Sequence, residues 1–158
     1  MNPSKVIFLD IDGVLNDIAT ETKAPLGFIG LNDSMIKNLK KIVDITDAKV
    51  VLTSTWKSEW DENPDDRSAD GQYLNDKLEE FNIKIADKTT DKVSDRGHGI
   101  RQYLANHPEI QKWIVLDDDI FHDYKECGIM PYLIHTSYYC GGLTDKLANK
   151  AIKKLEGT

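Results

Sequence analysis

Val6-Ile7-Phe8-Leu9-Asp10-Ile11-Asp12-Gly13, close to the start of the chain, is the stretch that decides the fold. Its first four residues are apolar and favour extended structure, which predicts a strand buried on both faces. The apolar run stops at Asp10, and the Asp-Gly pair that follows is typical of a loop. Two carboxylates, at Asp10 and Asp12, therefore follow a buried strand two positions apart and can point into one site.

Two later segments repeat this signature. Lys49-Val50-Val51-Leu52 leads into Thr53-Ser54-Thr55, and Trp113-Ile114-Val115-Leu116 leads into Asp117-Asp118-Asp119. The carboxyl ends of parallel strands meet at one edge of a sheet, where ligands bind in open α/β folds. We therefore expect the polar residues behind these strands to lie near Asp10.

Helical periodicity separates the strands. Amphipathic helices are predicted at 32–43, 73–81, 96–106 and 145–155, and further strands are predicted at 83–85 and 132–134. Alternating strands and helices predict an α/β fold, here a Rossmann-like three-layer sandwich with a mostly parallel central sheet. The polar segment at 58–70 is too short for an independent cap, so we expect one domain over 1–158.

Composition excludes several classes of protein. The 158 residues carry a formal net charge of -7, which disfavours nonspecific coating of nucleic acid. No apolar run approaches the ~20 residues of a membrane span, so we expect no membrane contact. The two cysteines, Cys127 and Cys140, lack a CxxC spacing, which favours reduced thiols and a cytoplasmic location.

The acids at the strand ends predict a metal site. Asp117 and Asp118 beside Asp10 would crowd like charges together, and a cation relieves that repulsion. Hard carboxylate oxygens suit Mg²⁺. We expect ligands from Asp10, Asp117 and Asp118, with Asp12 contributing its backbone carbonyl.

The same acids suit phosphoryl transfer. A carboxylate such as Asp10 can attack a phosphoryl group to give an aspartyl-phosphate when nearby charges neutralise the phosphate. A second carboxyl that stays off the metal can protonate the leaving oxygen and later deprotonate the attacking water. Asp12 fits that second role.

These residues also resemble a known family at three places. Phe8-Leu9-Asp10-Ile11-Asp12-Gly13-Val14-Leu15-Asn16 resembles the first motif of the haloacid dehalogenase-like (HAD) phosphatases. Val51-Leu52-Thr53-Ser54 is similar to their second motif, and Val115-Leu116-Asp117-Asp118 looks like their acidic fourth motif. The resemblance implies that Thr53 holds the phosphoryl group and that Mg²⁺ binds at the fourth motif. An acid at Asp12 implies phosphoryl transfer rather than dehalogenation.

The third motif of this family is a cation, usually Lys, near the start of the helix before the fourth-motif strand. Lys92, Arg96 and Arg101 all lie in that part of the chain. We choose Arg96, because it stands at the predicted helix start, and assign it to offset the charge of the transferring phosphate.

The substrate should contact residues next to these motifs. Gly13, Ser54 and Lys57 are assigned to substrate binding, while Trp56 either stacks on the substrate or packs against the loop at 24–30. The segments at 52–57, 116–119 and 142–144 look most like the capless HAD domains associated with RNA-repair and polynucleotide phosphatase proteins. That resemblance implies an open site and a nucleotide or polynucleotide end as the phosphorylated substrate.

Two alternatives stand beside this interpretation. A small-metabolite phosphatase would need the 24–30 loop or a neighbouring subunit to close over the site, and a non-catalytic phosphate-binding module would keep the fold without turnover. No GxxxxGK[ST] or GxGxxG pattern supports nucleotide binding through a glycine-rich loop. A calcium loop that starts at Asp10 fails, because Leu15 stands where Gly is required. The histidines lack metal-ligand spacing and receive no role, and Asp119 and Asp123 are expected to be solvated or capping residues.

Overall fold

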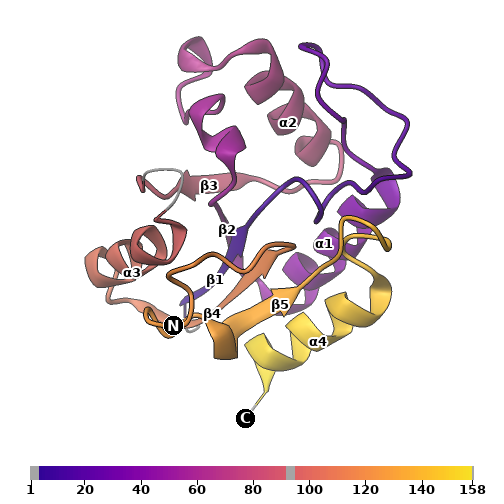
Figure 1. Cartoon of the computed structure of the whole chain (residues 1–158). Coiled ribbons are helices and arrows are strands. Elements are labelled where there is room, and N and C mark those ends of the chain that lie inside the picture. The colour runs from indigo at the N-terminus through magenta and orange to yellow at the C-terminus, as the bar shows by residue number, and fades with distance from the viewer. Residues whose placement is uncertain (1–3, 92–94, 158) are drawn as a thin grey trace.

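The computed structural model describes residues 4–91 and 95–157, and its centre is a five-stranded parallel sheet (Figure 1). The strands lie in the order β3-β2-β1-β4-β5, and each pairs in parallel with its neighbours. Their bounds are β1 Ser4–Leu9, β2 Lys49–Leu52, β3 Ile85–Lys88, β4 Ile110–Asp117 and β5 Leu133–His135. The predicted Rossmann-like α/β fold is confirmed.

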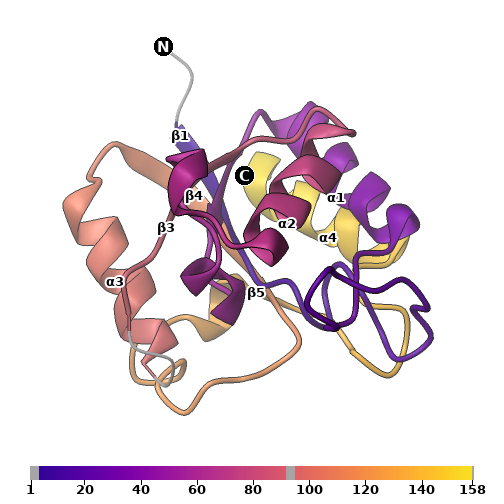
Figure 2. The same cartoon turned by 90° about the horizontal axis from the view of Figure 1, so that it is seen from above.

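Helices cover both faces of this sheet. They are α1 Asp33–Thr46, α2 Ala69–Glu79, α3 Arg96–Asn106 and α4 Asp145–Glu156. Figure 2 shows α1 and α4 on one side of the strands and α3 on the other. Side chains alternate along β1 accordingly, so Ile7 and Leu9 enter the core beneath α1 and α4, whereas Val6 and Phe8 pack towards Ile100 of α3. Burial on both faces explains why β1 is apolar at every position from Val6 to Leu9.

The start of α3 is held by a residue from elsewhere in the chain. Asp95 precedes the helix but makes no side-chain cap. Instead Asp123, in the loop after β4, accepts hydrogen bonds from the backbone N–H groups of Gly97 (3.1 Å) and His98 (3.0 Å). Asp123 is fully buried, so it is a capping residue rather than a solvated one. This cap fixes the first turn of α3, which carries Arg96, near the carboxyl end of β4.

Two strand boundaries differ from the prediction. The strand predicted at 83–85 instead runs from Ile85 to Lys88, because Ile83 still belongs to the turn that closes α2, where its N–H bonds Leu78 O. The polar residue Asp87 lies in this strand, which is at the edge of the sheet beside β2 and so tolerates polar side chains. The strand predicted at 132–134 begins one residue later, since Tyr132 ends a 3-10 turn and stacks on Trp113.

The long connections after β1 and β2 pack on the same core as the sheet. Leu31 in the first connection and Trp60 in the second both belong to the apolar cluster that includes Ile7 and Leu9. These connections contain an isolated β-bridge, the helix α2, and 3-10 helices at Thr55–Ser58 and Pro64–Asp66. Within 4–91 and 95–157 there is no separate cap, and no helix there has both the length and the apolar character to cross a membrane.

Candidate active site

Polar residues at the ends of three strands lie at one edge of the sheet. The backbone N–H of Asp10 donates to Leu116 O (2.9 Å), and the N–H of Thr53 donates to Leu9 O (2.9 Å). These bonds continue the parallel ladder one residue past β1 and β2. Asp10, Thr53 and Asp117 are therefore neighbours at the carboxyl ends of β1, β2 and β4, as the strand pattern predicts.

A cluster of three carboxylates occupies this edge. One oxygen each from Asp10, Asp117 and Asp118 lies within 4.8 Å of the other two. Burial, and then the negative charge of Asp117, hold the pKa of Asp10 well above its ordinary value. Burial also raises the pKa of Asp118. The cluster brings three acidic side chains together and offers only hard oxygen donors, so it fits a Mg²⁺ ion.

Among the described residues, Arg96 pairs with two acids of the cluster. Its Nη1 is 2.9 Å from Asp117 Oδ2 and 3.3 Å from Asp10 Oδ1. Burial alone would lower the pKa of the guanidinium, but the charges of Asp10 and Asp117 raise it. Arg101 instead donates to the backbone carbonyls of Cys127 (2.5 Å) and Gly128 (3.1 Å), and Lys92 lies outside the described residues. Of the two described candidates for the third motif, the structure brings Arg96 to the site.

Two further groups hold Asp117 in place. The Tyr124 hydroxyl donates to Asp117 Oδ2 (2.7 Å), and the backbone N–H of Asp119 donates to Oδ1 (3.0 Å). Tyr124 is fully buried. Sequence reasoning missed it, because a tyrosine in the loop behind β4 carries no motif signal.

Asp12 stands apart from the carboxylate cluster. Its side chain is exposed, Oδ1 accepts from Asn16 Nδ2 (3.0 Å), and Oδ2 accepts from Trp56 Nε1 (3.2 Å). Trp56 is buried, and its ring lies 6.4 Å from that of Phe28 in the 24–30 loop. Trp56 thus packs against this loop, one of its two predicted roles, and also orients the acid.

Gly13 allows Asp118 to approach the first motif. Its φ of 81° lies in the left-handed region, and a Cβ there would come within 2.1 Å of Asp118 Oδ2. Its N–H donates to Asn16 Oδ1 (2.9 Å), and its carbonyl accepts from Thr136 Oγ1 (2.6 Å). A residue with a side chain at this position would push Asp118 away.

The residues of the second motif and just after it differ in whether their side chains have partners inside the protein. Thr53 Oγ1 is buried and has no hydrogen-bond partner within the described part of the chain, which normally costs about 1–3 kcal/mol. Ser54 Oγ accepts from the Trp56 N–H (3.2 Å), and Lys57 Nζ pairs with Asp91 Oδ1 at 2.6 Å. The Thr53 hydroxyl thus has no described partner, whereas Ser54 and Lys57, both predicted to bind substrate, already have partners inside the protein.

A cavity of about 180 Å³ opens beside Asp12. Its walls include Phe28, which is 59% exposed, Trp56 and Asp70. Asp70 is fully buried; its Oδ1 accepts from the Leu26 N–H (3.0 Å), and its Oδ2 has no partner among the described residues. Phe28 and Asp70 could not be predicted from the sequence, because the cavity brings together two segments that lie more than forty positions apart, as the bond between Leu26 and Asp70 shows.

Comparison with known proteins adds a family to this geometry. The family described as "HAD domain in Swiss Army Knife RNA repair proteins" matches residues 6–148. The matched region runs from β1 into α4 and includes all the strand ends described above. No curated protein and no solved structure gives a significant match.

Proposed function

The chain belongs to the family of HAD domains in Swiss Army Knife RNA repair proteins, and on that premise we propose that it is a Mg²⁺-dependent phosphomonoesterase that acts through a phosphorylated Asp10. We propose a nucleotide or polynucleotide end as its substrate. Family membership places the chain in a superfamily of phosphatase-type hydrolases. The observation that carries the finer proposal is the arrangement around Asp10, where Arg96 Nη1 lies at 3.3 Å and two further carboxylates complete an oxygen-donor cluster.

In the first step, a carboxylate oxygen of Asp10 attacks phosphorus, and the bond from phosphorus to the leaving oxygen breaks. Asp12 gives its proton to that oxygen. Arg96 offsets the charge on the phosphoryl oxygens, and the Thr53 hydroxyl, which has no other described partner, donates to one of them.

In the second step, Asp12 takes a proton from water, the water oxygen attacks phosphorus, and the bond to Asp10 breaks. Asp12 is suited to both steps because Asn16 and Trp56 hold its carboxylate outside the cluster. Mg²⁺ bound by Asp10, Asp117, Asp118 and the Asp12 carbonyl would neutralise charge on the phosphoryl oxygens.

The cavity beside Asp12 supports the choice of substrate. A leaving oxygen that receives the proton of Asp12 carries its organic group into the space lined by Phe28, Trp56 and Asp70. The exposed ring of Phe28 suits stacking with a nucleobase, and the unpartnered oxygen of Asp70 suits an N–H or O–H donor of a base or sugar. A small metabolite could use the same cavity, because Phe28 belongs to the 24–30 loop named above as a possible lid.

The test begins with hydrolysis of an aryl phosphate with Mg²⁺, with a chelator, and with Asp10→Asn. The proposal requires that activity depends on both the metal and Asp10. A panel of mononucleotides, 5′- and 3′-phosphorylated oligonucleotides and sugar phosphates then compares wild type with Phe28→Ala.

We expect Phe28→Ala to raise KM for nucleotide ends about tenfold, since stacking on one base contributes about 1–3 kcal/mol. Leu26→Ala is the matched control, because Leu26 is an exposed residue of the same loop and does not line the cavity. A preference for sugar phosphates with no effect of Phe28→Ala would favour the metabolite phosphatase. Inactivity on every ester would favour the binding module.

A further inference from the structure

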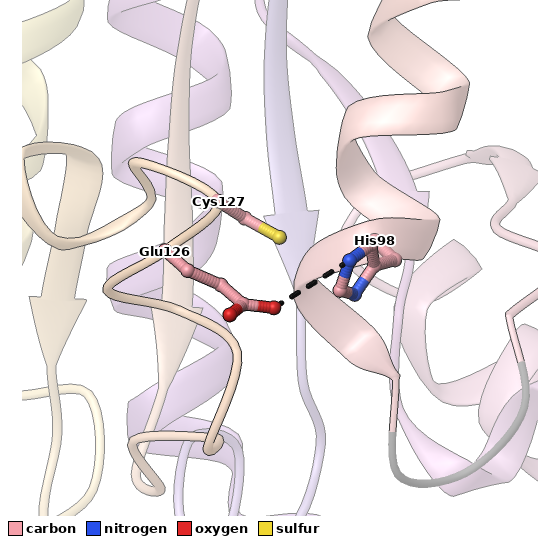
Figure 3. Close-up of side chains that lie close together, drawn as sticks. All are labelled: His98, Glu126 and Cys127. Carbon is pink, nitrogen blue, oxygen red and sulfur yellow. Dashed lines mark ion pairs between the residues drawn. The ribbon is translucent and has the colours of Figure 1, made fainter.

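A second group of metal-ligating side chains lies outside the carboxylate cluster. Figure 3 shows His98, on the first turn of α3, facing Glu126 and Cys127 in the loop after β4. One ligand atom from each of the three lies within 4.8 Å of the other two, and His98 Nε2 is 3.6 Å from Glu126 Oε1. A nitrogen, an oxygen and a sulfur donor thus face one point in space.

Asp123 orients the histidine for this arrangement. His98 Nδ1 lies 2.8 Å from Asp123 Oδ2, and the carboxylate is fixed by its bonds to the N–H groups of Gly97 and His98. A Cβ on Gly97 would come within 2.8 Å of Asp123 Oδ1, so glycine permits this close approach. In the tautomer that carries its proton on Nδ1, directed at Asp123, the ring keeps the Nε2 lone pair for a metal ion. A carboxylate that orients a histidine in this way is the usual support of a metal-bound imidazole.

We propose that His98 Nε2, the Glu126 carboxylate and Cys127 Sγ bind one transition-metal dication of the Zn²⁺ class. A thiol beside an imidazole favours such an ion over Mg²⁺, which prefers oxygen ligands. Nitrogen and oxygen atoms that each lie ~2.0–2.2 Å from a tetrahedral ion are roughly 3.3–3.6 Å apart, which matches the separation of Nε2 and Oε1. Three protein ligands leave the fourth position to water, and the exposed His98 and Glu126 give the ion access from solvent.

The position of this site gives the ion a structural role. His98 follows Arg96 by two residues on α3, and Glu126 follows Tyr124 by two residues in the loop. Arg96 and Tyr124 both bond Asp117. An ion held between the helix and the loop therefore ties together the two segments that support Asp117, without entering the carboxylate cluster.

The test uses the full chain after removal of metals by chelation, titrated with Co²⁺ as a spectroscopic substitute for Zn²⁺. We expect one equivalent to give a near-ultraviolet thiolate-to-cobalt band, which one equivalent of Zn²⁺ abolishes. Cys127→Ser should lose the band, and His98→Gln should bind Co²⁺ at least tenfold more weakly. Cys140→Ser is the matched control, because Cys140 is exposed and lies outside the group, and it should retain the band.

Two further measurements keep the result interpretable. Asp118→Asn should retain the band, which separates this site from the carboxylate cluster. Zn²⁺ should raise the Tm of wild type by more than it raises that of Cys127→Ser, each compared with its own metal-free form. Absence of a thiolate band in wild type, or an unchanged band in Cys127→Ser, would overturn the proposal.

Discussion

The indole Nε1 of Trp56 donates a hydrogen bond to Asp12 Oδ2 across 3.2 Å. The bond joins the segment behind β2 to the acid behind β1 and holds the carboxylate where a leaving oxygen needs a proton. Trp56→Phe keeps an aromatic ring but removes the donor. We expect kcat to fall about tenfold, because a hydrogen bond to a charged group contributes about 1.5–3 kcal/mol and each ~1.4 kcal/mol of barrier is tenfold in rate.

Trp60→Phe is the matched control for this measurement. Trp60 Nε1 donates to Asn75 Oδ1 (3.1 Å) in a buried contact that does not involve Asp12. Its loss should lower the free energy of unfolding by about 1–3 kcal/mol and leave kcat unchanged. Equal losses of kcat in Trp56→Phe and Trp60→Phe would show that the bond to Asp12 has no specific role in catalysis.

Gly13→Ala should abolish most activity, because the new Cβ would collide with Asp118 Oδ2 and displace a predicted metal ligand. Gly27→Ala is the control, since Gly27 has a φ of 95° but no atom within 4 Å of a Cβ. Left-handed backbone should destabilise both variants by about 1–2 kcal/mol. Steady-state rates and urea unfolding separate the two effects, and an active Gly13→Ala protein would contradict the close approach of Asp118.

Asp118→Asn should reduce the rise in Tm that Mg²⁺ produces, while leaving the metal-free protein at least as stable as wild type. The substitution relieves repulsion within the cluster but removes a ligand, and a tenfold weaker affinity lowers the stabilisation by about 1.4 kcal/mol. Asp119→Asn is the control, because its exposed side chain lies outside the cluster. Scanning calorimetry with and without Mg²⁺ measures both effects, and identical Mg²⁺ responses in the two variants would exclude Asp118 as a ligand.

Lys57→Met should destabilise the protein by about 3–5 kcal/mol, because it leaves the nearly buried Asp91 without its cation. KM for an aryl phosphate should stay the same. Lys41→Met is the control, since the pair between Lys41 and Asp145 is exposed and contributes about 0–1 kcal/mol. A raised KM with unchanged stability would instead return Lys57 to the substrate-binding role predicted from its place behind the second motif.

Much of the fold could be predicted, because the relevant patterns are local. β2 and the third helix have the predicted bounds, since an apolar run that ends in hydroxyl residues and a helical period each show themselves within a few positions. The meeting of Asp10, Thr53 and Asp117 could also be predicted, because parallel strands share one carboxyl edge.

The remaining features depend on contacts between distant parts of the chain. Asp123 looks like a surface acid in sequence, yet it caps α3 by accepting from the N–H of Gly97, 26 positions earlier. Lys57 forms an ion pair with Asp91 rather than with the carboxylate cluster. Tyr124 bonds Asp117 only because its loop folds back over β4. Such pairings depend on tertiary packing, which local periodicity does not encode.

The central claim is that phosphorus becomes bonded to Asp10, and the most direct measurement is to capture that species. Asp12→Asn should accumulate it when mixed with an aryl phosphate and Mg²⁺, because this leaving group needs no proton whereas the second step has lost its base. Mass spectrometry after acid quench should show one phosphoryl group on Asp10, removable by hydroxylamine and absent from Asp10→Asn. Turnover with no phosphorylated protein at any time point, or a phosphoryl group on another residue, would contradict the account.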